Sequence, residues 1–346
     1  MEQAVNIDPT QSINVVAVGG GTGLSTLLSG LKNFVREPEA FVSIRDLSAI
    51  VAVTDDGGSS GRLRTELQML PPGDIRNCMV ALSEDSLLLS RLFRYRFKGD
   101  GGLSGHNFGN LFLAALSELT GDFAEAVRLS SGILASKGHI FPATTTANVH
   151  LRAELDDGTT IQGETRISQV GPSIKRLYLE PETCHPMREA LGAIEKADII
   201  TIGPGSLFTS LVPPLLVQGV AETIGRSSAT KVFISNLMTQ PGETSGLSAA
   251  AHLHELGKYA PNVIFDHIIL NAQTISDEQR TRYALEGSEQ IGIDEGKAVA
   301  EACGANVVYA NLLDDGEKVR HDPERLAAAV LSSVSVMATA LREAGA

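Results

Sequence analysis

A glycine-rich stretch near the amino terminus has the composition of a phosphate-binding loop. Residues 19–23 read GGGTG, between an apolar β-branched run at 13–18 and a segment with helical spacing of its apolar residues. Bare backbone N–H groups at the start of a helix, where partial positive charge gathers, favour an anion. A tight turn that needs only positive φ is the simpler interpretation, but three consecutive glycines favour phosphate binding. The predicted contacts are Gly20, Gly21, Thr22 and Gly23.

Two adjacent carboxylates follow a second apolar run. Asp55 and Asp56 precede Gly57 in the stretch TDDGGSSGR. Such a pair can hold Mg²⁺ together with a substrate phosphate, or accept hydrogen bonds from ribose or sugar hydroxyls. An Asx-turn that caps the two glycines is the alternative. We predict that this loop contacts the ligand, and we predict no other metal-binding group.

Two further segments carry polar groups at predicted helix starts. The stretch GPGS, which contains Gly203, Gly205 and Ser206, follows the apolar run at 197–202 and suits an anion or the edge of a nucleobase. Asn107 lies in SGHNFGNL, where it could face the same crevice or serve only the local structure. All four residues are candidates for ligand binding.

The common catalytic and nucleotide-binding motifs are incomplete in this chain. Leu24 or Ser25 stands where a dinucleotide fingerprint needs its third glycine, and Gly257-Lys258 is followed by Tyr259 rather than by the Ser or Thr of a P-loop. The stretch GPGS does not form a nucleophile elbow, and no spacing identifies a Ser, His and Asp set. The sequence therefore assigns no catalytic residue. The broken fingerprint also argues against a nicotinamide oxidoreductase, which ranks behind the two hypotheses given below.

Composition excludes several classes of protein. Lys and Arg number 28 against 41 Asp and Glu, a net charge of −13 that repels nucleic acid and anionic membranes. The three cysteines are more than a hundred residues apart, so neither a disulfide framework nor a structural zinc site is indicated. No apolar run reaches the roughly 18 residues of a spanning helix. We expect a cytoplasmic protein with no membrane insertion.

The elements around these loops predict an α/β fold. Five apolar runs, at 13–18, 47–53, 197–203, 231–236 and 266–271, alternate with helical or helix-compatible segments. Continuous apolar strands are covered on both faces, and right-handed crossovers make such a sheet parallel. We predict a Rossmann-like, doubly wound, mainly parallel sheet, whose carboxyl edge gathers the glycine loops.

Two segments depart from this alternation. Residues 74–134 show apolar faces at helical spacing and predict consecutive helices. Residues 136–182 predict a small β excursion with a hairpin turn at Asp156-Asp157-Gly158. Asp322 and Pro323 predict the start of a terminal helix. With no obvious linker, we predict a single α/β domain over 1–346.

Seven motifs in a fixed order carry a resemblance to a known family. They are GGGTGLS, TDDGGSSGRLR, PPGDIRN, GHNFGNL, TIGPGSLFTSLVPPLLV, SNLMTQPGET and RHDP. Over about residues 13–342 the chain resembles the 2-phospho-L-lactate transferase-like (CofD-like) superfamily, and more closely its gluconeogenesis factor, or YvcK-like, branch. The resemblance implies a Rossmann-like cytoplasmic protein that binds a UDP-sugar, UDP-N-acetylglucosamine in that branch, with a link to cell-wall synthesis and cell shape during gluconeogenic growth.

The resemblance also implies roles for particular residues. It assigns the phosphate loop to residues 20–23, the acidic loop to Asp55 and Asp56, and a polar position after its strand to Asn236. Tyr283 and Arg320, which on spacing alone are surface residues, match UDP-sugar contacts of the regulator branch.

The leading hypothesis is therefore a regulatory protein that binds a nucleotide sugar, without turnover and without a required cofactor. The alternative is a Mg²⁺-dependent transferase that acts on a nucleotide-linked substrate, in which Asp55 and Asp56 hold the metal. The expected partners are the nucleotide-sugar ligand, a second copy of the chain in a homodimer, and proteins of cell-wall synthesis.

Overall fold

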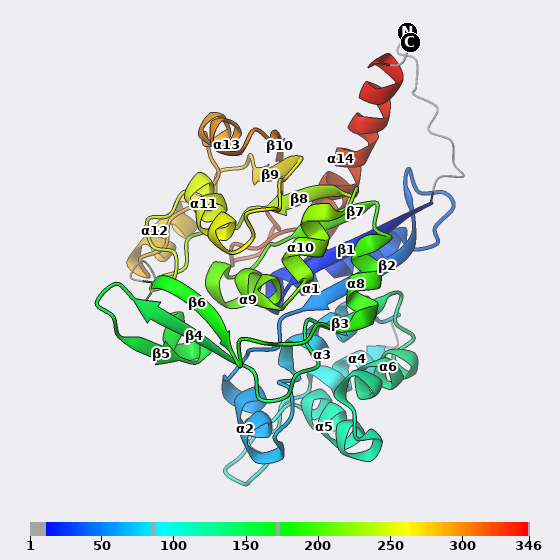
Figure 1. Ribbon diagram of the computed structural model, residues 1–346, viewed down its shortest axis with the longest axis vertical. Coiled ribbons are helices and arrows are strands. Elements are labelled where there is room, and N and C mark those ends of the chain that lie inside the picture. The colour runs from blue at the N-terminus through cyan, green and yellow to red at the C-terminus, as the bar shows by residue number, and fades with distance from the viewer. Residues whose placement is uncertain (1–11, 85–86, 171–173, 345–346) are drawn as a thin grey trace.

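A seven-stranded parallel sheet forms the centre of the computed structural model, which describes residues 12–84, 87–170 and 174–344 (Figure 1). The amino-terminal residues 1–11, which contain no long apolar run, lie outside the described part. The strands of the sheet are β1 (Ser12–Gly19), β2 (Ser43–Val51), β3 (His139–Pro142), β7 (Ile199–Ile202), β8 (Thr230–Ile234), β9 (His267–Asn271) and β10 (Asn306–Ala310).

The strand order places a switch point in the middle of the sheet. The order is β10-β9-β8-β7-β1-β2-β3, and every pair is parallel. From β1 the chain builds outward to β3 on one side, then returns to build β7 to β10 on the other. The loops after β1 and β7 therefore leave the carboxyl edge in opposite directions, which opens a crevice between them. The predicted fold class is confirmed.

Alternate residues of β1 show that both faces of the sheet are buried. Val15 and Ala17 belong to one apolar cluster, and Val16 and Val18 belong to another, each with at most 1% of its surface exposed. A strand with water on one face would alternate apolar and polar residues, whereas this strand is apolar throughout. This double burial explains why five strands were recognisable from the sequence alone.

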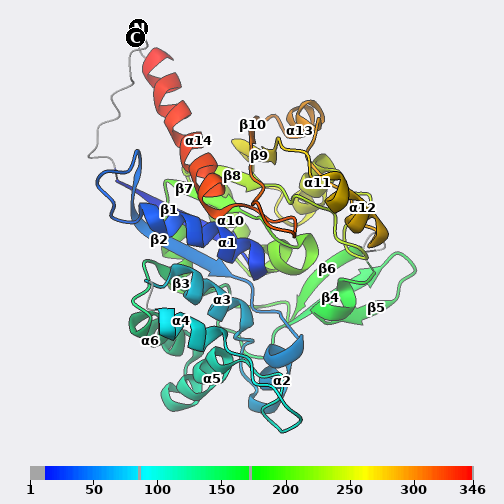
Figure 2. The ribbon, with the colours of Figure 1, turned by 180° about the vertical axis from the view of Figure 1, so that it is seen from behind.

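Helices cover the two faces of the sheet, and a group of further helices lies next to β3 (Figures 1 and 2). The long helix α14 runs outward from the body in both views. The helices are α1 (Gly21–Leu31), α2 (Gly58–Leu67), α3 (Gly73–Leu82), α4 (Leu87–Arg94), α5 (Phe108–Thr120), α6 (Phe123–Ile133), α7 (Glu164–Ile167), α8 (Arg188–Glu195), α9 (Val212–Leu216), α10 (Val220–Arg226), α11 (Ala249–Tyr259), α12 (Asp277–Leu285), α13 (Gly296–Cys303) and α14 (Pro323–Ala344), with the short helices η1 (Lys32–Phe34) and η3 (Leu207–Leu211).

The structure refines the expected β excursion. A separate antiparallel sheet has the order β5-β4-β6, built from β4 (His150–Leu155), β5 (Thr160–Gln162) and β6 (Ile174–Glu180), and its hairpin turns at Gly158 with φ +81°. However, β3 joins the large sheet beside β2, so the excursion begins only after it. β3 and β10 were not predicted because both are short edge strands and neither is a long apolar run.

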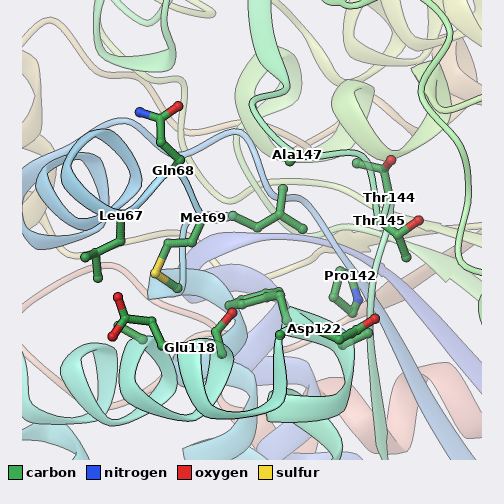
Figure 3. A pocket seen from close by; sticks show the side chains of 15 residues that line it. Leu67, Gln68, Met69, Glu118, Asp122, Pro142, Thr144, Thr145 and Ala147 are labelled. Atoms are coloured by element: carbon green, nitrogen blue, oxygen red, sulfur yellow. The ribbon is translucent and has the colours of Figure 1, made fainter.

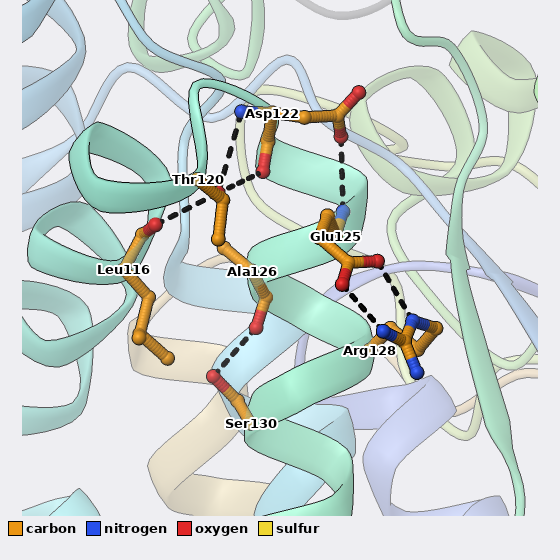
Figure 4. Close-up of polar contacts among 7 residues, drawn as sticks. All are labelled: Leu116, Thr120, Asp122, Glu125, Ala126, Arg128 and Ser130. Carbon is orange, nitrogen blue, oxygen red and sulfur yellow. Dashed lines mark hydrogen bonds and ion pairs between the residues drawn. The ribbon is translucent and has the colours of Figure 1, made fainter.

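The predicted helical segment at 74–134 forms α3 to α6 on the β3 side of the sheet, where α3 packs against α1. At one corner α5 ends at Thr120 and α6 begins directly after Asp122 (Figure 4). The Asp122 carboxylate accepts a hydrogen bond from the Glu125 N–H at 2.9 Å, and the Thr120 hydroxyl donates to the Leu116 carbonyl at 2.8 Å. The Asp122 side chain thereby satisfies an N–H group that the start of α6 would otherwise leave unpaired.

No single helix in residues 12–84, 87–170 and 174–344 is both long and apolar enough to cross a membrane. One pair of helical segments, Leu207–Leu216 and Val220–Arg226, meets the criteria of length and composition together, although the two are bent by 81° relative to each other.

The terminal helix crosses α1 at very short range. As predicted, the Asp322 side chain caps α14, accepting from the Arg325 N–H at 2.8 Å. A Cβ atom at Gly30 would lie 1.9 Å from the Pro323 carbonyl oxygen and 3.0 Å from the Ala327 Cβ. The crossing therefore requires glycine for close approach, because its backbone contact leaves no room for a methyl group.

We expect Gly30→Ala to lower the free energy of unfolding by about 1–3 kcal/mol, because the added methyl group must push α14 away from α1. Gly132→Ala is the matched control, since Gly132 lies in α6 and a Cβ there meets nothing within 4 Å. The control should gain up to about 1 kcal/mol from helix propensity. Urea denaturation measures both changes; equal stability of Gly30→Ala and the parent would contradict the crossing.

Candidate functional site

A groove of ≈ 300 Å³ lies at the carboxyl edge of the large sheet, over the switch point. Four segments line it: the loop after β1, the loop after β7, the segment after β8 and the turn that precedes α14. The lining residues are Gly20, Gly21, Thr22, Gly23, Thr26, Pro204, Gly205, Ser206, Ser210, Asn236, Leu237, Met238, Gln240, Val319, Arg320 and His321. The structure thus brings together eight of the predicted site residues.

The first turn of α1 presents backbone donors to this groove. The Gly21 N–H donates to the Asp74 carboxylate at 2.8 Å. The N–H groups of Thr22 and Gly23 have no hydrogen-bond partner within the described part of the chain. A Cβ at Gly23 would lie 2.2 Å from the Pro204 carbonyl oxygen, so only glycine permits this approach of the two loops. Two free N–H groups at a helix N-terminus are suited to a phosphate.

Asn236 joins the loops after β7 and β8. Its Oδ1 accepts from the Gly205 N–H at 3.0 Å, and its Nδ2 donates to the Gly205 carbonyl at 2.8 Å. Gly203 has φ +93°, and a Cβ there would lie 2.6 Å from the Ile234 carbonyl oxygen. Gly203 therefore shapes the loop from outside the groove lining, whereas Asn236 lines the groove and also fixes its wall.

Arg320 carries the positive charge at the groove. Its guanidinium is exposed and makes no ion pair or hydrogen bond with any described residue, so it is available to an anion. Tyr283 is not among the lining residues; its hydroxyl accepts from the Val319 N–H at 3.0 Å. The two residues that the resemblance linked are adjacent in the structure, but Tyr283 supports the backbone beside Arg320 instead of lining the groove.

The acidic loop lies outside the groove lining. One oxygen of Asp55 accepts from the Gly57 N–H at 2.8 Å, which is the Asx-turn contact. One oxygen of Asp56 accepts from the Thr165 N–H at 3.0 Å and from the Thr165 hydroxyl at 2.8 Å. Asn107 is 1% exposed and accepts from the Asn110 N–H at 3.3 Å as the N-cap of α5. Each of these side chains has a structural contact in place.

Several carboxyl groups gather behind the glycine loop and repel one another. Burial first, and then the charge of Asp55, raise the pKa of Asp74 to about 6, although the Gly21 N–H and Arg76 oppose the shift. Glu164, at the start of α7, is affected more strongly. Burial, followed by the charges of Asp55, Asp74, Asp56 and Glu243, raises the pKa of its carboxyl to about 9. Glu164 is therefore protonated and uncharged near neutral pH.

The acidic groups do not form a preassembled metal cage. Among residues 12–84, 87–170 and 174–344, no three His, Cys, Asp or Glu side chains are arranged to hold a metal ion. Asp55 has one oxygen engaged by Gly57, and Asp56 has one oxygen engaged by Thr165. A Mg²⁺ ion at this loop would need water and ligand phosphates to complete its six oxygen ligands.

A second pocket of ≈ 340 Å³ opens between the end of α2, the α5–α6 corner and the segment after β3 (Figure 3). Gln68, Glu118 and Asp122 contribute its acidic and amide groups, and Met69 and Pro142 contribute apolar surface. None of the predicted site residues lines this pocket, so it is separate from the groove.

Sequence reasoning missed the roles of four residues that shape the site. Asp74 lies in the PPGDIRN motif, where the sequence is compatible with a simple cap of its own helix, but its carboxylate accepts from the first N–H of α1. Glu164 lies in the excursion and carried no motif, while Gln240 and His321 line the groove from segments named only for the resemblance. The RHDP motif contained His321, so that signal was present in the sequence.

Comparisons with known proteins show a family match and a shared fold. The family model described as 2-phospho-L-lactate transferase CofD matches residues 15–313. The chain is 46% identical over 318 residues to the gluconeogenesis factor of Halalkalibacterium halodurans, covering 92% of this chain and 95% of that protein. It is 42% identical over 318 residues to the gluconeogenesis factor of Bacillus subtilis strain 168, covering 92% and 96%. A crystal structure of a Bacillus halodurans protein superposes with a TM-score of 0.86 at 45% identity, covering 93% of this chain and all of that one.

The raised pKa of Glu164 predicts a loss of stability with rising pH. Between about pH 4.5 and 9 the unfolded chain loses this proton and the folded chain keeps it, so the free energy of unfolding falls across that window. One such site contributes at most about 1.4 kcal/mol per pH unit.

Glu164→Gln should flatten this slope, and Glu278→Gln, which changes an exposed carboxyl on α12, should follow the parent. Urea midpoints at pH 5, 7 and 9 test the difference. Parallel profiles for the parent and Glu164→Gln would show that the carboxyl is ionised in the folded protein at neutral pH.

Proposed function

The chain belongs to the 2-phospho-L-lactate transferase CofD family and is similar over most of its length to gluconeogenesis factors, and from this premise we propose that it is a regulatory protein that binds a UDP-sugar. The proposed ligand is UDP-N-acetylglucosamine. Its binding would report the supply of a cell-wall precursor during growth on gluconeogenic carbon sources, in the cytoplasm, to proteins of cell-wall synthesis.

The observation that carries this proposal is the pairing of free backbone donors with a free guanidinium across one groove. Thr22 and Gly23 offer unpaired N–H groups on one wall, and Arg320 offers a planar charged fork on another. A diphosphate can accept from both at once, because it carries several oxygens and more than one negative charge. The organic groups on either side of the diphosphate would then extend along the groove.

The surroundings favour binding over turnover. Within the described residues, the groove lining includes neither a carboxylate nor a Ser, His and Asp set that could act on a bound ligand. Asn236, one of the polar side chains that do line it, is engaged in holding the loops together. A site of this kind orients a ligand and transmits its presence to the loops.

The matched family model gives reason to consider the second candidate, a Mg²⁺-dependent transferase. In that case Asp55 and Asp56 would hold the ion, which would neutralise charge on the phosphates. The second oxygen of each aspartate is available for this purpose, as neither accepts a hydrogen bond from a described residue. The two candidates differ in whether binding depends on the ion.

Calorimetric titration with UDP-N-acetylglucosamine tests the groove directly. Arg320→Ala should weaken binding at least tenfold, because a charge-assisted hydrogen bond contributes about 1.5–3 kcal/mol, and Arg320→Lys should recover only part of the loss. Arg128→Ala, which removes an exposed arginine on the distant helix α6, should bind like the parent. Equal affinity of all four proteins would place the diphosphate elsewhere.

Titration in excess chelator separates regulator from transferase. We expect binding of UDP-N-acetylglucosamine to survive chelator, and Asp56→Asn to cost about 1–2 kcal/mol at most, because neutral hydrogen bonds require no ion. Mass analysis of the ligand after incubation with and without Mg²⁺ is the parallel measurement. Strict metal dependence together with a new product would establish the transferase and reject the regulator.

A further inference from the structure

Ser210 is the most deeply buried of the polar side chains that line the groove. It is 6% exposed, whereas Ser206, Asn236 and Gln240 are all more accessible. Its hydroxyl makes no hydrogen bond with any described residue, and the oxygen atom remains reachable by solvent. Because the polar atoms of a folded protein normally pair, a hydroxyl that is fixed by burial and open to a groove is available to a ligand.

The backbone around Ser210 explains why its hydroxyl is free. A buried hydroxyl inside a helix commonly donates to a carbonyl of the preceding turn, as Ser130 does to the Ala126 carbonyl at 2.7 Å. Ser210 lies instead in the wider, π-helical turn of η3. There the Ser206 carbonyl accepts from the Ser210 N–H at 2.9 Å and from the Leu211 N–H at 3.0 Å. Two donors occupy both lone pairs of that carbonyl, so the hydroxyl of Ser210 has no acceptor in its own helix.

The same turn places Ser210 between the loops after β1 and β7. A Cβ atom at Gly20 or at Gly205 would lie 3.4 Å from the Cβ of Ser210. A Cβ atom at Gly21, the first residue of α1, would lie 3.7 Å from the Ser210 Oγ. The hydroxyl therefore lies against the first turn of α1, next to the free N–H groups of residues 22 and 23. Turns of this π-helical kind are rare and are frequent at functional sites.

We propose that Ser210 is a ligand-binding residue of the groove, and that its hydroxyl donates a hydrogen bond to the phosphate at the first turn of α1. Phosphate oxygens are strong acceptors, and this hydroxyl has no acceptor in the protein. The side chain is already held between two loops, so little rotamer freedom is lost when the ligand binds. Together with the free N–H groups and Arg320, it gives a diphosphate donors from three separate segments: α1, η3 and the turn before α14.

This inference rests on the proposed function, since both place a diphosphate in the same groove. The two differ in what they require of the rest of the ligand. The proposed function needs a nucleoside and a sugar, whereas the Ser210 contact needs only the diphosphate. Inorganic pyrophosphate, UDP and UDP-N-acetylglucosamine share the diphosphate and increase in their organic part, so these three probes separate the two statements.

Two variants remove the donor while the shape between the loops is kept. Ser210→Ala deletes the hydroxyl and retains the Cβ that packs near Gly20 and Gly205. Ser210→Cys keeps a side chain of similar shape, but its thiol is a weak donor. Ser130→Ala is the matched control, because it removes a buried helical hydroxyl from α6, which does not line the groove. Thermal unfolding of each variant checks that the protein is folded.

Calorimetric titration of the parent and the variants with the three probes tests the contact. We expect Ser210→Ala and Ser210→Cys to weaken binding about tenfold, as for one lost hydrogen bond to an anion. The factor should be the same for pyrophosphate, UDP and UDP-N-acetylglucosamine, because the hydroxyl meets the part that they share. A change in the shape of the groove wall would instead cost the larger ligands more. Ser130→Ala should bind all three like the parent.

Three results would overturn the inference. One is parent-like affinity of the folded Ser210→Ala protein for every probe. Another is a loss that is absent with pyrophosphate and appears only as the organic part grows. The third is a parent that does not bind pyrophosphate at all. A parent that binds pyrophosphate through Ser210 and does not bind UDP-N-acetylglucosamine would reject the proposed function and keep the Ser210 contact.

Discussion

The close approach of two loop backbones at the switch point is the constraint on which the site depends. Gly23 lies so near the Pro204 carbonyl that a single Cβ would have to occupy a position 2.2 Å from its oxygen. Asn236 then ties Gly205 to the next strand by two hydrogen bonds. The loops after β1, β7 and β8 are thus held together as one wall. The close contact between Gly23 and Pro204 fixes the first turn of α1, and with it the orientation of the free N–H groups.

A second consequence is electrostatic. The first N–H of α1 is taken by Asp74, so the helix N-terminus has a carboxylate beside it before any anion arrives. An ionised Glu164 would add to this negative charge, but its raised pKa keeps it neutral near pH 7. The acids behind the loop can therefore lie close to a phosphate site without the full repulsion that their number suggests.

The small antiparallel sheet takes part in this arrangement. Asp56, on the loop after β2, accepts two hydrogen bonds from Thr165 in α7, which follows β5 directly. That contact attaches the inserted sheet to the carboxyl edge of the large one, and it brings Glu164 among the other carboxyls. An insertion that appears peripheral in the order of strands (Figure 1) thus supplies a member of the acidic group behind the glycine loop.

The sequence by itself determined the parallel sheet, the glycine loop at a helix start and the cap at Asp322, because each depends on residues close together in the chain. Apolar runs such as 13–18 report burial on both faces, and glycines report close approach. Short edge strands such as β3 escaped because their neighbours, not their own residues, make them strands. Only the tertiary structure decided which carboxyl caps α1, that Tyr283 holds Val319, and that Arg320 lines the same groove as the glycine loop. Those contacts join segments that are up to about three hundred residues apart in the chain. A local sequence pattern does not contain the distances between such segments or the burial that they share.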